Sequence, residues 1–225
     1  MECAEKQLIN NSYYDIVIIG GGLAGSILSM RLKQESADLS ICIIEKKTSF
    51  PKKVGESTSD LSAMYFRRLG IDHLLKKHIQ KSGLRFIFKD GSEFSSPSYK
   101  SIANGFQIDR SIFDEDLLTE AKKLGVKVFR GATFKNFEST NDKQKITYSY
   151  EDKELTITSK WVVDASGKQG VIANSLNWID TETNLNTAAS WAHFKNISAQ
   201  DKWDTLDANE WNSKAIGPKE HSTQH

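Results

Sequence analysis

One short stretch, residues 14–26, constrains the fold of this chain more than any other part of the sequence. It reads YDIVIIGGGLAGS, an unbroken apolar run at 16–19 followed by G-x-G-x-x-G at Gly20, Gly22 and Gly25. Such a run is typical of a central parallel strand buried on both faces. The three glycines predict a tight turn, a close backbone approach to a pyrophosphate, and a helix packed closely on the strand. The N-terminus of that helix would point its free N–H groups at the pyrophosphate.

A second apolar strand supports a dinucleotide site. Residues 39–44 (LSICII) follow the expected helix and end in Glu45, about 25 residues after Gly20. A carboxylate at this point accepts hydrogen bonds from an adenosine ribose, and it disfavours a 2′-phosphate. The sequence therefore predicts an unphosphorylated adenine dinucleotide. The alternative, in which Glu45 is a surface acid at a strand end, stays open at this stage.

Composition narrows the class of protein. The 225 residues include 30 basic and 29 acidic side chains, so no basic field is available to hold nucleic acid. Neither Cys3 and Cys42 nor the scattered histidines have a metal-ligand spacing, and we expect no metal site. The N-terminus has no signal-peptide core, and the longest apolar run is too short to span a bilayer. These features favour a cytoplasmic protein without a membrane partner.

The pattern of elements predicts an α/β fold in which a Rossmann-like parallel sheet is interleaved with an antiparallel sheet. We expect a helix with its N-cap among residues 57–59 and its end at Gly70, and a second helix from Ile71 to about Gln80. A hairpin around Asp90-Gly91 and a helix near 111–124 with a Ser111/Asp114 capping box should follow. Further strands are expected at 126–129, 146–150, 155–157 and 161–163, the last short and buried. The expected divisions are a first nucleotide-binding part (14–80), the start of a substrate-side sheet (81–105), a second nucleotide-binding part with a β-hairpin (106–175), a return to the substrate-side sheet (176–195), and a polar, incomplete or disordered segment (196–225).

Together these motifs resemble those of FAD-dependent oxidoreductases of the glutathione-reductase-like class. Five features occur in the order found in that class. They are the glycine loop, Glu45, VGES at 54–57, Asp109-Arg110 followed by Phe113-Asp114, and DASG at 164–167. More narrowly, the chain resembles the tryptophan and phenol halogenases and their geranylgeranyl-reductase-like relatives. The narrower resemblance rests on the Gly-Glu-Ser segment, on Lys81-x-Gly83-x-x-Phe86, and on AASWAHF at 188–194.

The resemblance implies FAD as the cofactor and gives roles to particular residues. The glycine loop, with Ala24, would hold the pyrophosphate, and Glu45 with its neighbour Lys46 would lie at the adenosine end. Arg110 would lie along the dinucleotide, where its planar fork suits phosphate. Glu56 and Ser57 would lie near the flavin ring, and Asp164 would contact the cofactor where a parallel strand ends. The implied cofactor-binding set is Gly20, Gly22, Ala24, Gly25, Glu45, Lys46, Glu56, Ser57, Arg110 and Asp164.

Lys81 occupies the position of the catalytic lysine of the halogenases. In that family a flavin hydroperoxide and a halide give a hypohalous acid (HOX), which the lysine binds or orients for halogenation of an aromatic or electron-rich substrate. An ammonium in a partly dry channel can polarise HOX by hydrogen bonding. The alternative is a solvated lysine at the end of a basic helix that also carries Lys76 and Lys77.

The chain also departs from the family pattern. The Trp-x-Trp-x-Ile-Pro segment, the later Gly-Asp region and the C-terminal substrate-binding helices are not found, so we expect the N-terminal portion of a longer enzyme. The expected partners are a small-molecule substrate, a halide ion and a separate flavin reductase. Two alternatives to a halogenase stay open: an FAD-dependent reductase or monooxygenase that uses no halide, and a non-catalytic dinucleotide-binding remnant.

Overall fold

The computed structural model describes residues 12–81, 83–87, 89–97, 105–140, 142–180 and 190–192. They belong to two compact units, one formed by Met1–Pro51 and Ser111–Asn184 and the other by Lys52–Arg110 and Leu185–His225. Of the predicted return to the substrate-side sheet, residues 181–189 and 193–195 lie outside the described residues, as does the polar segment 196–225. This division into two units does not test the predicted boundaries between nucleotide-binding and substrate-side regions. The boundaries at residues 80, 105, 175 and 195 therefore stay predictions.

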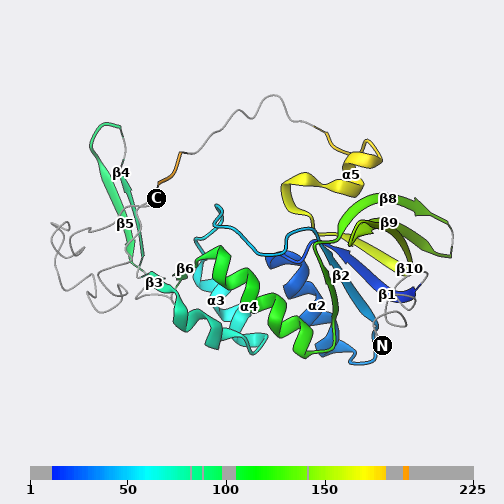
Figure 1. The fold of residues 1–225 in the computed structure, drawn as a ribbon. Helices are drawn as coiled ribbons and strands as arrows, with labels where there is room; N and C mark the ends of the chain where they lie inside the picture. Colours follow the sequence, from blue (N-terminus) through cyan, green and yellow to red (C-terminus); the bar gives the residue numbers. More distant parts are fainter. Residues whose placement is uncertain are drawn as a thin grey trace. The chain divides into compact units, whose positions relative to one another are not determined.

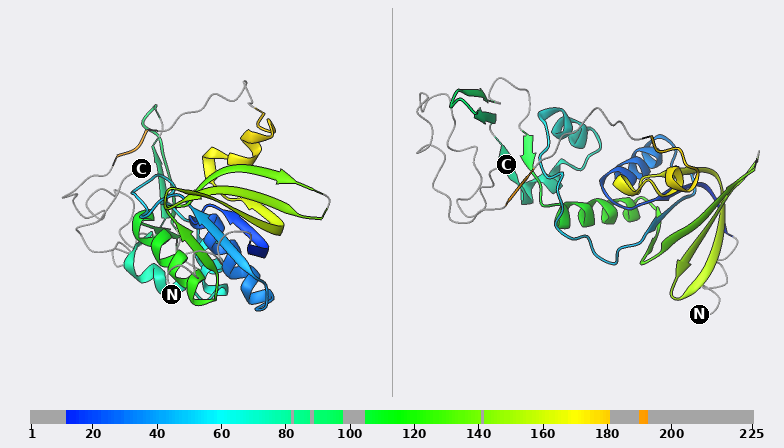
Figure 2. Two further views of the ribbon diagram at one scale, coloured as in Figure 1. Left: turned by 45° about the vertical axis from the view of Figure 1, so that its right-hand side comes forward. Right: turned by 90° about the horizontal axis from the view of Figure 1, so that it is seen from above.

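A six-stranded sheet forms the first unit and confirms the predicted Rossmann-like class (Figure 1). Its order is β7-β2-β1-β10-β9-β8. The first four strands of that order run parallel, and the last two are antiparallel additions. The strands are β1 (Ser12–Ile19), β2 (Ile41–Glu45), β7 (Lys127–Arg130), β8 (Thr133–Ser139), β9 (Gln144–Tyr150) and β10 (Lys153–Asp164). The twist of this sheet is visible from two further sides in Figure 2.

Strand β1 is buried on both faces, as its apolar run predicts. Ile18 faces helix α2 (Leu23–Glu35), because its Cγ2 lies 3.1 Å from the position that a Cβ on Gly25 would take. Val17 and Ile19 belong to the hydrophobic cluster that also contains Phe129 and Tyr148. Burying each such side chain stabilises the fold by about 1.5–3 kcal/mol, so the position of β1 at the centre of the parallel strands is strongly determined.

The predicted hairpin between β9 and β10 is confirmed, with a two-residue turn at Glu151 and Asp152. Both turn residues have positive φ, 48° and 58°, as a hairpin turn matched to the twist of its strands requires. The prediction of a separate short buried strand at 161–163 was wrong. Strand β10 runs without a break from the hairpin to Asp164, and Trp161 on it is 64% exposed.

The second unit contains helix α3 (Asp60–Arg68), the 3-10 helix η1 (Asp72–Lys77), and two two-stranded antiparallel sheets. One sheet pairs β3 (Ile79–Lys81) with β6 (Gly105–Gln107), and the other pairs β4 (Gly83–Ile87) with β5 (Glu93–Pro97) around the predicted Asp90-Gly91 turn. Ser59 caps α3 by accepting a hydrogen bond from the backbone of Ser62.

Two local predictions need correction. The helix expected from Ile71 to about Gln80 is a single 3-10 segment followed by a strand, because pairing with β6 holds residues 79–81 in extended form. Helix α4 (Arg110–Lys123) begins one residue before Ser111. Ser111 therefore lies within the first turn and is not the N-cap of the proposed capping box.

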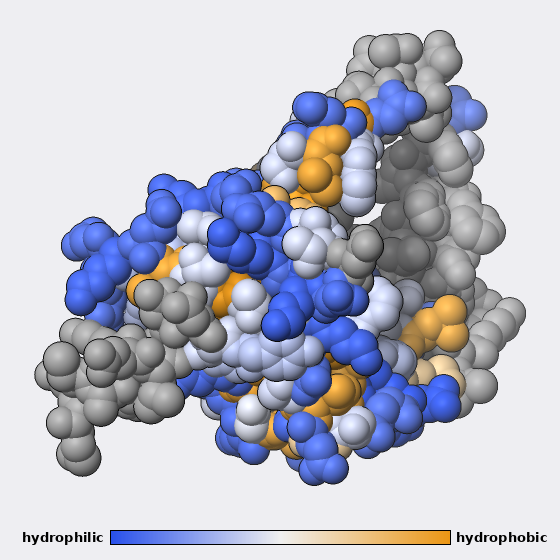
Figure 3. All heavy atoms as spheres, turned by 90° about the vertical axis from the view of Figure 1, so that its right-hand side faces the viewer, coloured by the Kyte–Doolittle hydropathy of each residue, from blue (hydrophilic) through white to orange (hydrophobic). Residues whose placement is uncertain are grey.

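The 3-10 helix η3 (Gly167–Gln169) and helix α5 (Val171–Ser175) follow β10, and Ile172 on α5 joins the cluster around Val17. Figure 3 shows separate hydrophobic patches among hydrophilic side chains on one face of the molecule. Over the residues that the model describes, no helix combines the length and the apolar character needed to cross a bilayer.

Candidate functional site

The loops that follow the four parallel strands meet at one edge of the sheet. The backbone N–H of Gly20 donates to the carbonyl of Ile44 at 2.8 Å, and that of Ala165 donates to Ile19 at 2.9 Å. After β7, the N–H of Ala132 donates to the carbonyl of Glu45 at 3.1 Å. Ligands of open α/β sheets bind at this carboxyl edge. The structure therefore brings the glycine loop, Glu45 and Asp164 to the same edge of the sheet.

The glycine loop has the geometry of a phosphate cradle. Gly20 has φ +107°, and a Cβ there would lie 2.4 Å from the carbonyl oxygen of Ala165. A Cβ on Gly25 would lie 1.9 Å from the carbonyl oxygen of Gly20, so α2 starts directly against the turn. Gly22 precedes α2 and provides no side-chain cap, and Ala24 in the first turn is exposed. This bare helix N-terminus fits an anionic pyrophosphate.

Glu45 is only 6% exposed and organises the loop around it. Its Oε2 accepts from the backbone N–H of Gly21 at 2.7 Å, and its Oε1 accepts from that of Lys47 at 2.8 Å. A carboxylate has about four acceptor sites, so these two bonds leave capacity for ribose hydroxyls. Glu45 is therefore a positioned buried acid and not the surface acid of the alternative interpretation.

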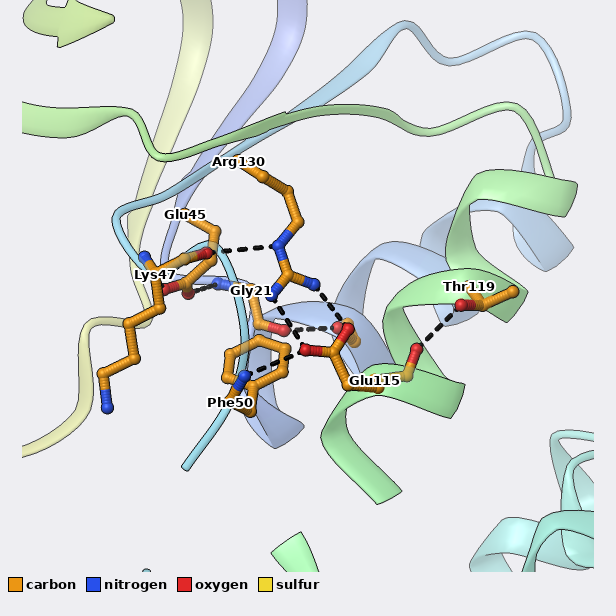
Figure 4. A network of polar contacts seen from close by, with 8 residues as sticks. Gly21, Glu45, Lys47, Phe50, Glu115, Thr119 and Arg130 are labelled. Carbon is orange, nitrogen blue, oxygen red and sulfur yellow. Dashed lines mark hydrogen bonds and ion pairs between the residues drawn. The ribbon is translucent and has the colours of Figure 1, made fainter. Parts of the chain in front are cut away.

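A clamp of four residues, which we call the Arg130 clamp, fixes the loop after Glu45 (Figure 4). The guanidinium of Arg130 donates to both carboxylate oxygens of Glu115, at 2.6 and 2.9 Å, and its Nε donates to the carbonyl of Lys47 at 3.1 Å. Glu115 also accepts from the backbone N–H of Phe50 at 2.9 Å, and the Arg130 guanidinium lies 4.7 Å from the centre of the Phe50 ring. The hydrogen bonds from Arg130 hold the pKa of Glu115 below its usual range.

Asp164, at the end of β10, forms hydrogen bonds within its own loop. It accepts from the N–H and hydroxyl of Ser166, at 3.0 and 2.5 Å, and from the N–H of Ile172 at 2.8 Å. Burial alone would raise the pKa of Asp164, but these hydrogen bonds lower it overall. Lys46 donates to the side chain of Gln169 in the same loop, at 2.6 Å. Asp164 thus shapes the turn that lies against Gly20.

The second unit contains the other predicted residues. Arg110, at the start of α4, donates to the carbonyl of Gly55 at 3.0 Å and is 9% exposed. Glu56 is also buried, and its carbonyl accepts from the N–H of Ile108 at 2.8 Å. Segment 55–58 is therefore held against β6 and the start of α4.

Lys81 lies half-buried at the end of β3, and its ammonium donates to the hydroxyl of Ser57. Gly105 on β6 permits this contact, because a Cβ there would lie 3.3 Å from Cε of Lys81 and 2.6 Å from the carbonyl of Thr58. Burial lowers the pKa of Lys81. The alternative of a fully solvated lysine at a helix end therefore fails, since residue 81 ends a strand and its side chain crosses β6.

Several residues of the site were not predicted from the sequence. The glycine motif does not include Gly21, so the sequence does not single this residue out. Its backbone N–H nevertheless donates a hydrogen bond to the carboxylate of Glu45. Arg130 and Glu115 are 15 residues apart and form no sequence motif. An arginine at the end of an expected parallel strand is only a weak indication of a functional residue. Among the described residues, no cluster of three or more His, Cys, Asp and Glu side chains could hold a metal ion.

The fold and the glycine loop define a Rossmann-type dinucleotide-binding protein. The comparison with protein families makes this specific: residues 13–218 match the FAD binding domain family. The chain belongs to this family, and its cofactor is FAD.

Similar proteins include flavin-dependent halogenases. The chain is 29% identical over 213 residues to the flavin-dependent halogenase armH1 of Armillaria mellea, covering 88% of this chain and 40% of that protein. It is 30% identical to a 1H-pyrrole-2-carbonyl-[peptidyl-carrier protein] brominase of Pseudoalteromonas luteoviolacea, covering 82% and 45% of the two chains. The solved structure of the flavin-dependent brominase Bmp2 is 28% identical, with a TM-score of 0.65, over 72% of this chain and 40% of that one. The chain thus spans less than half the length of these relatives.

Proposed function

We propose that this chain is the FAD-binding part of a flavin-dependent halogenase. The observation that carries the proposal is the half-buried Lys81, which crosses β6 to Ser57. The sequence resemblance gives this lysine the position of the halogenase lysine. The similarity to halogenases and a brominase of 28–30% identity supports it. A reduced flavin supplies the electrons that let oxygen convert a halide into HOX.

The first unit would hold the adenosine and pyrophosphate end of FAD. The N–H groups of the glycine loop (Gly20, Gly22, Ala24 and Gly25) would bind the pyrophosphate, and Glu45 would accept from ribose hydroxyls with Lys46 beside it. The bare start of α2 and the spare acceptor sites of Glu45 support these roles. Asp164 would contact the cofactor through the turn that its carboxylate shapes.

Three further residues would serve the flavin end. Arg110 would lie along the dinucleotide, and Glu56 and Ser57 would lie beside the flavin ring. The burial of Arg110 and Glu56, and the pairing of segment 56–58 with β6, support a fixed geometry for these residues.

Lys81 would orient HOX for attack by the substrate. Its ammonium donates a hydrogen bond to the oxygen of HOX, which makes the halogen more electrophilic. Partial burial strengthens this interaction, because fewer water molecules compete for the ammonium. We further propose a small electron-rich substrate, a halide ion and a separate flavin reductase as partners.

The experiment replaces Lys81→Ala in the complete protein and supplies reduced FAD, oxygen, bromide and a phenol. Halogenated product should fall by at least about 100-fold, the usual scale for losing a positioned catalytic group, while FAD binding stays unchanged. The matched control is Lys76→Ala, because Lys76 is an exposed lysine of η1.

Each of the other outcomes contradicts a specific part of the proposal. Halogenation that persists in Lys81→Ala would remove Lys81 from the mechanism. With wild-type Lys81, an oxygenated product that contains no bromine would identify a monooxygenase, and a reduced product would identify a reductase; neither uses a halide.

A further inference from the structure

His78 lies between η1 and β3, and its ring holds the junction between β6 and α4. Its Nδ1 accepts a hydrogen bond from the backbone N–H of Asp109, at 3.1 Å. Asp109 is 31 positions further along the chain and directly precedes the first residue of α4. A ring nitrogen that accepts a hydrogen bond carries no proton, so this contact requires a neutral ring with its proton on Nε2. The Nε2 atom is buried, and burial disfavours a charged ring.

The residues on either side of Asp109 hold the segment that leads into α3. The N–H of Ile108 donates to the carbonyl of Glu56 at 2.8 Å, and the guanidinium of Arg110 donates to the carbonyl of Gly55 at 3.0 Å. Three consecutive residues, 108–110, therefore join the end of β6 to two other segments of the second unit. Of these three contacts, only the one to His78 uses a side chain that ordinarily gains a proton near neutral pH.

The charged side chains on the elements around His78 carry both signs. They are Lys76 and Lys77 on η1, Lys81 on β3, Glu56 before α3, and Asp109 and Arg110 at the start of α4, whereas β6 carries none. The carboxylate of Asp109 lies 3.9 Å from the ammonium of Lys52. Carboxylates favour a charged imidazole and cations disfavour it. The hydrogen bond from Asp109 distinguishes the two forms directly, because it exists only when Nδ1 is free of a proton.

We propose that His78 is a proton-sensitive positioning residue, whose neutral ring holds residues 108–110 in place and whose protonation at Nδ1 displaces the N–H of Asp109. The proton and the N–H compete for the same lone pair, so one excludes the other. The junction therefore has its full stability above about pH 6.5, the ordinary pKa of histidine, and loses it as the pH falls further. Glu56 and Arg110, which belong to this junction, would lose their fixed geometry in acid.

The experiment measures hydrogen exchange at the backbone amides of 108–110 in the full chain without FAD. It compares pH 7.5 with pH 5.0, after correction for the intrinsic exchange rate at each pH. In the wild type, the protection of these amides should be about fivefold lower at pH 5.0, the scale of one hydrogen bond. In His78→Asn it should change by less than about twofold, because the amide oxygen of asparagine accepts from the same N–H and does not titrate.

The matched control is His73→Asn. His73 is an exposed histidine of η1, and its Nδ1 lies 3.2 Å from the carbonyl oxygen of Gly70. A carbonyl only accepts hydrogen bonds, so His73 donates in this contact, and a second proton on the ring leaves the contact intact. His73→Asn should therefore show the same fivefold loss of protection at 108–110 as the wild type.

Two results of the exchange measurement would overturn the inference. Equal protection of 108–110 at both pH values in the wild type would mean that the charge on His78 does not affect the junction. A loss of protection that persists in His78→Asn would assign the effect to another titrating group. Neither result depends on FAD or on halogenation, so this inference and the proposed function fail separately.

A second measurement keeps the inference testable if His78→Asn does not fold. Nitrogen NMR of the wild-type histidine rings reports which nitrogen carries the proton. At pH 7.5 the His78 ring should carry its proton on Nε2, and the Nδ1 resonance should be that of an unprotonated nitrogen. A proton on Nδ1 at this pH would contradict the inference, because the N–H of Asp109 would then have no lone pair to meet.

Discussion

The edge of the six-stranded sheet and the face of the small β3–β6 sheet differ in how their polar groups are paired. At the sheet edge, both oxygens of Glu45 accept backbone N–H groups, and Asp164 accepts three hydrogen bonds from its own loop. On the small sheet, Lys81 donates to Ser57 across a glycine, and the buried amide of Gln107 has no partner among the described residues.

This difference separates two kinds of binding surface. The sheet edge is organised before any ligand arrives, so the cofactor meets a cradle whose shape the protein alone maintains. The small sheet carries a buried amide whose two polar atoms have no hydrogen-bond partner among the described residues. Fixed geometry suits the part of FAD that never reacts, which we propose the sheet edge binds. Four substitutions test this comparison.

Gly25→Ala should have the largest effect. The new Cβ would lie 1.9 Å from the carbonyl oxygen of Gly20, an impossible contact with backbone. Moving α2 away from β1 should cost about 3 kcal/mol or more and abolish FAD binding. Thermal unfolding followed by circular dichroism measures the loss, with Ala37→Ser, at an exposed position after α2, as a control. If Gly25→Ala were as stable as the wild type, the turn between β1 and α2 would not be rigid.

Gly105→Ala should damage the other surface. Its Cβ would meet the carbonyl of Thr58 at 2.6 Å and Cε of Lys81 at 3.3 Å. We expect a loss of stability of about 2 kcal/mol with ADP affinity unchanged, because the adenosine site does not use β6. Gly91→Ala is the control; no atom lies within 4 Å of its Cβ, and it carries only the strain of a positive φ, about 1 kcal/mol. Lost ADP affinity in Gly105→Ala would contradict the proposal that the adenosine site is built without β6.

Glu45→Ala should weaken the binding of FAD and of ADP equally, by about tenfold, since we propose that Glu45 binds the adenosine end that both ligands share. The N–H of Gly21 would also lose its partner, at a cost of about 1–3 kcal/mol in stability. Parallel titrations with the two ligands measure the first effect, and Glu138→Ala, an exposed acid, is the control. If Glu45→Ala weakened the binding of FAD but not that of ADP, Glu45 would contact the flavin end of FAD and not the adenosine end.

Acid should weaken the Arg130 clamp. Because the folded-state pKa of Glu115 is depressed, its stabilisation is present above the unfolded value of about 4.3 and is lost as pH falls through the folded pKa. Glu115 is partly exposed, so the effect is about 1 kcal/mol. Urea unfolding at pH 6 and pH 3 should show a smaller stability difference in Arg130→Ala than in wild type. If wild type and Arg130→Ala lost the same stability between pH 6 and pH 3, Arg130 would not be the cause of the lowered pKa of Glu115.

Local rules made most of the fold predictable. The apolar run and glycines of 14–26, the Ser59 cap and the Asp90-Gly91 turn all act over a few residues, and the structure follows them. The spacing of Leu74, Leu75 and Ile79 also fits a helix, but residues 79–81 pair with a strand 26 positions further on, which no local pattern encodes. Likewise, the helix-to-strand pair of Glu115 and Arg130 and the isolation of the Gln107 amide arise from packing between distant segments.

The most direct test of the account is the visible absorption spectrum of the purified chain after it is mixed with FAD and desalted. If the sheet edge is a preformed cradle, the chain should retain flavin close to one equivalent, and Gly25→Ala should retain none. A wild-type chain that is folded by circular dichroism but loses all flavin on desalting would contradict the account, because the cradle would then be insufficient to hold the cofactor.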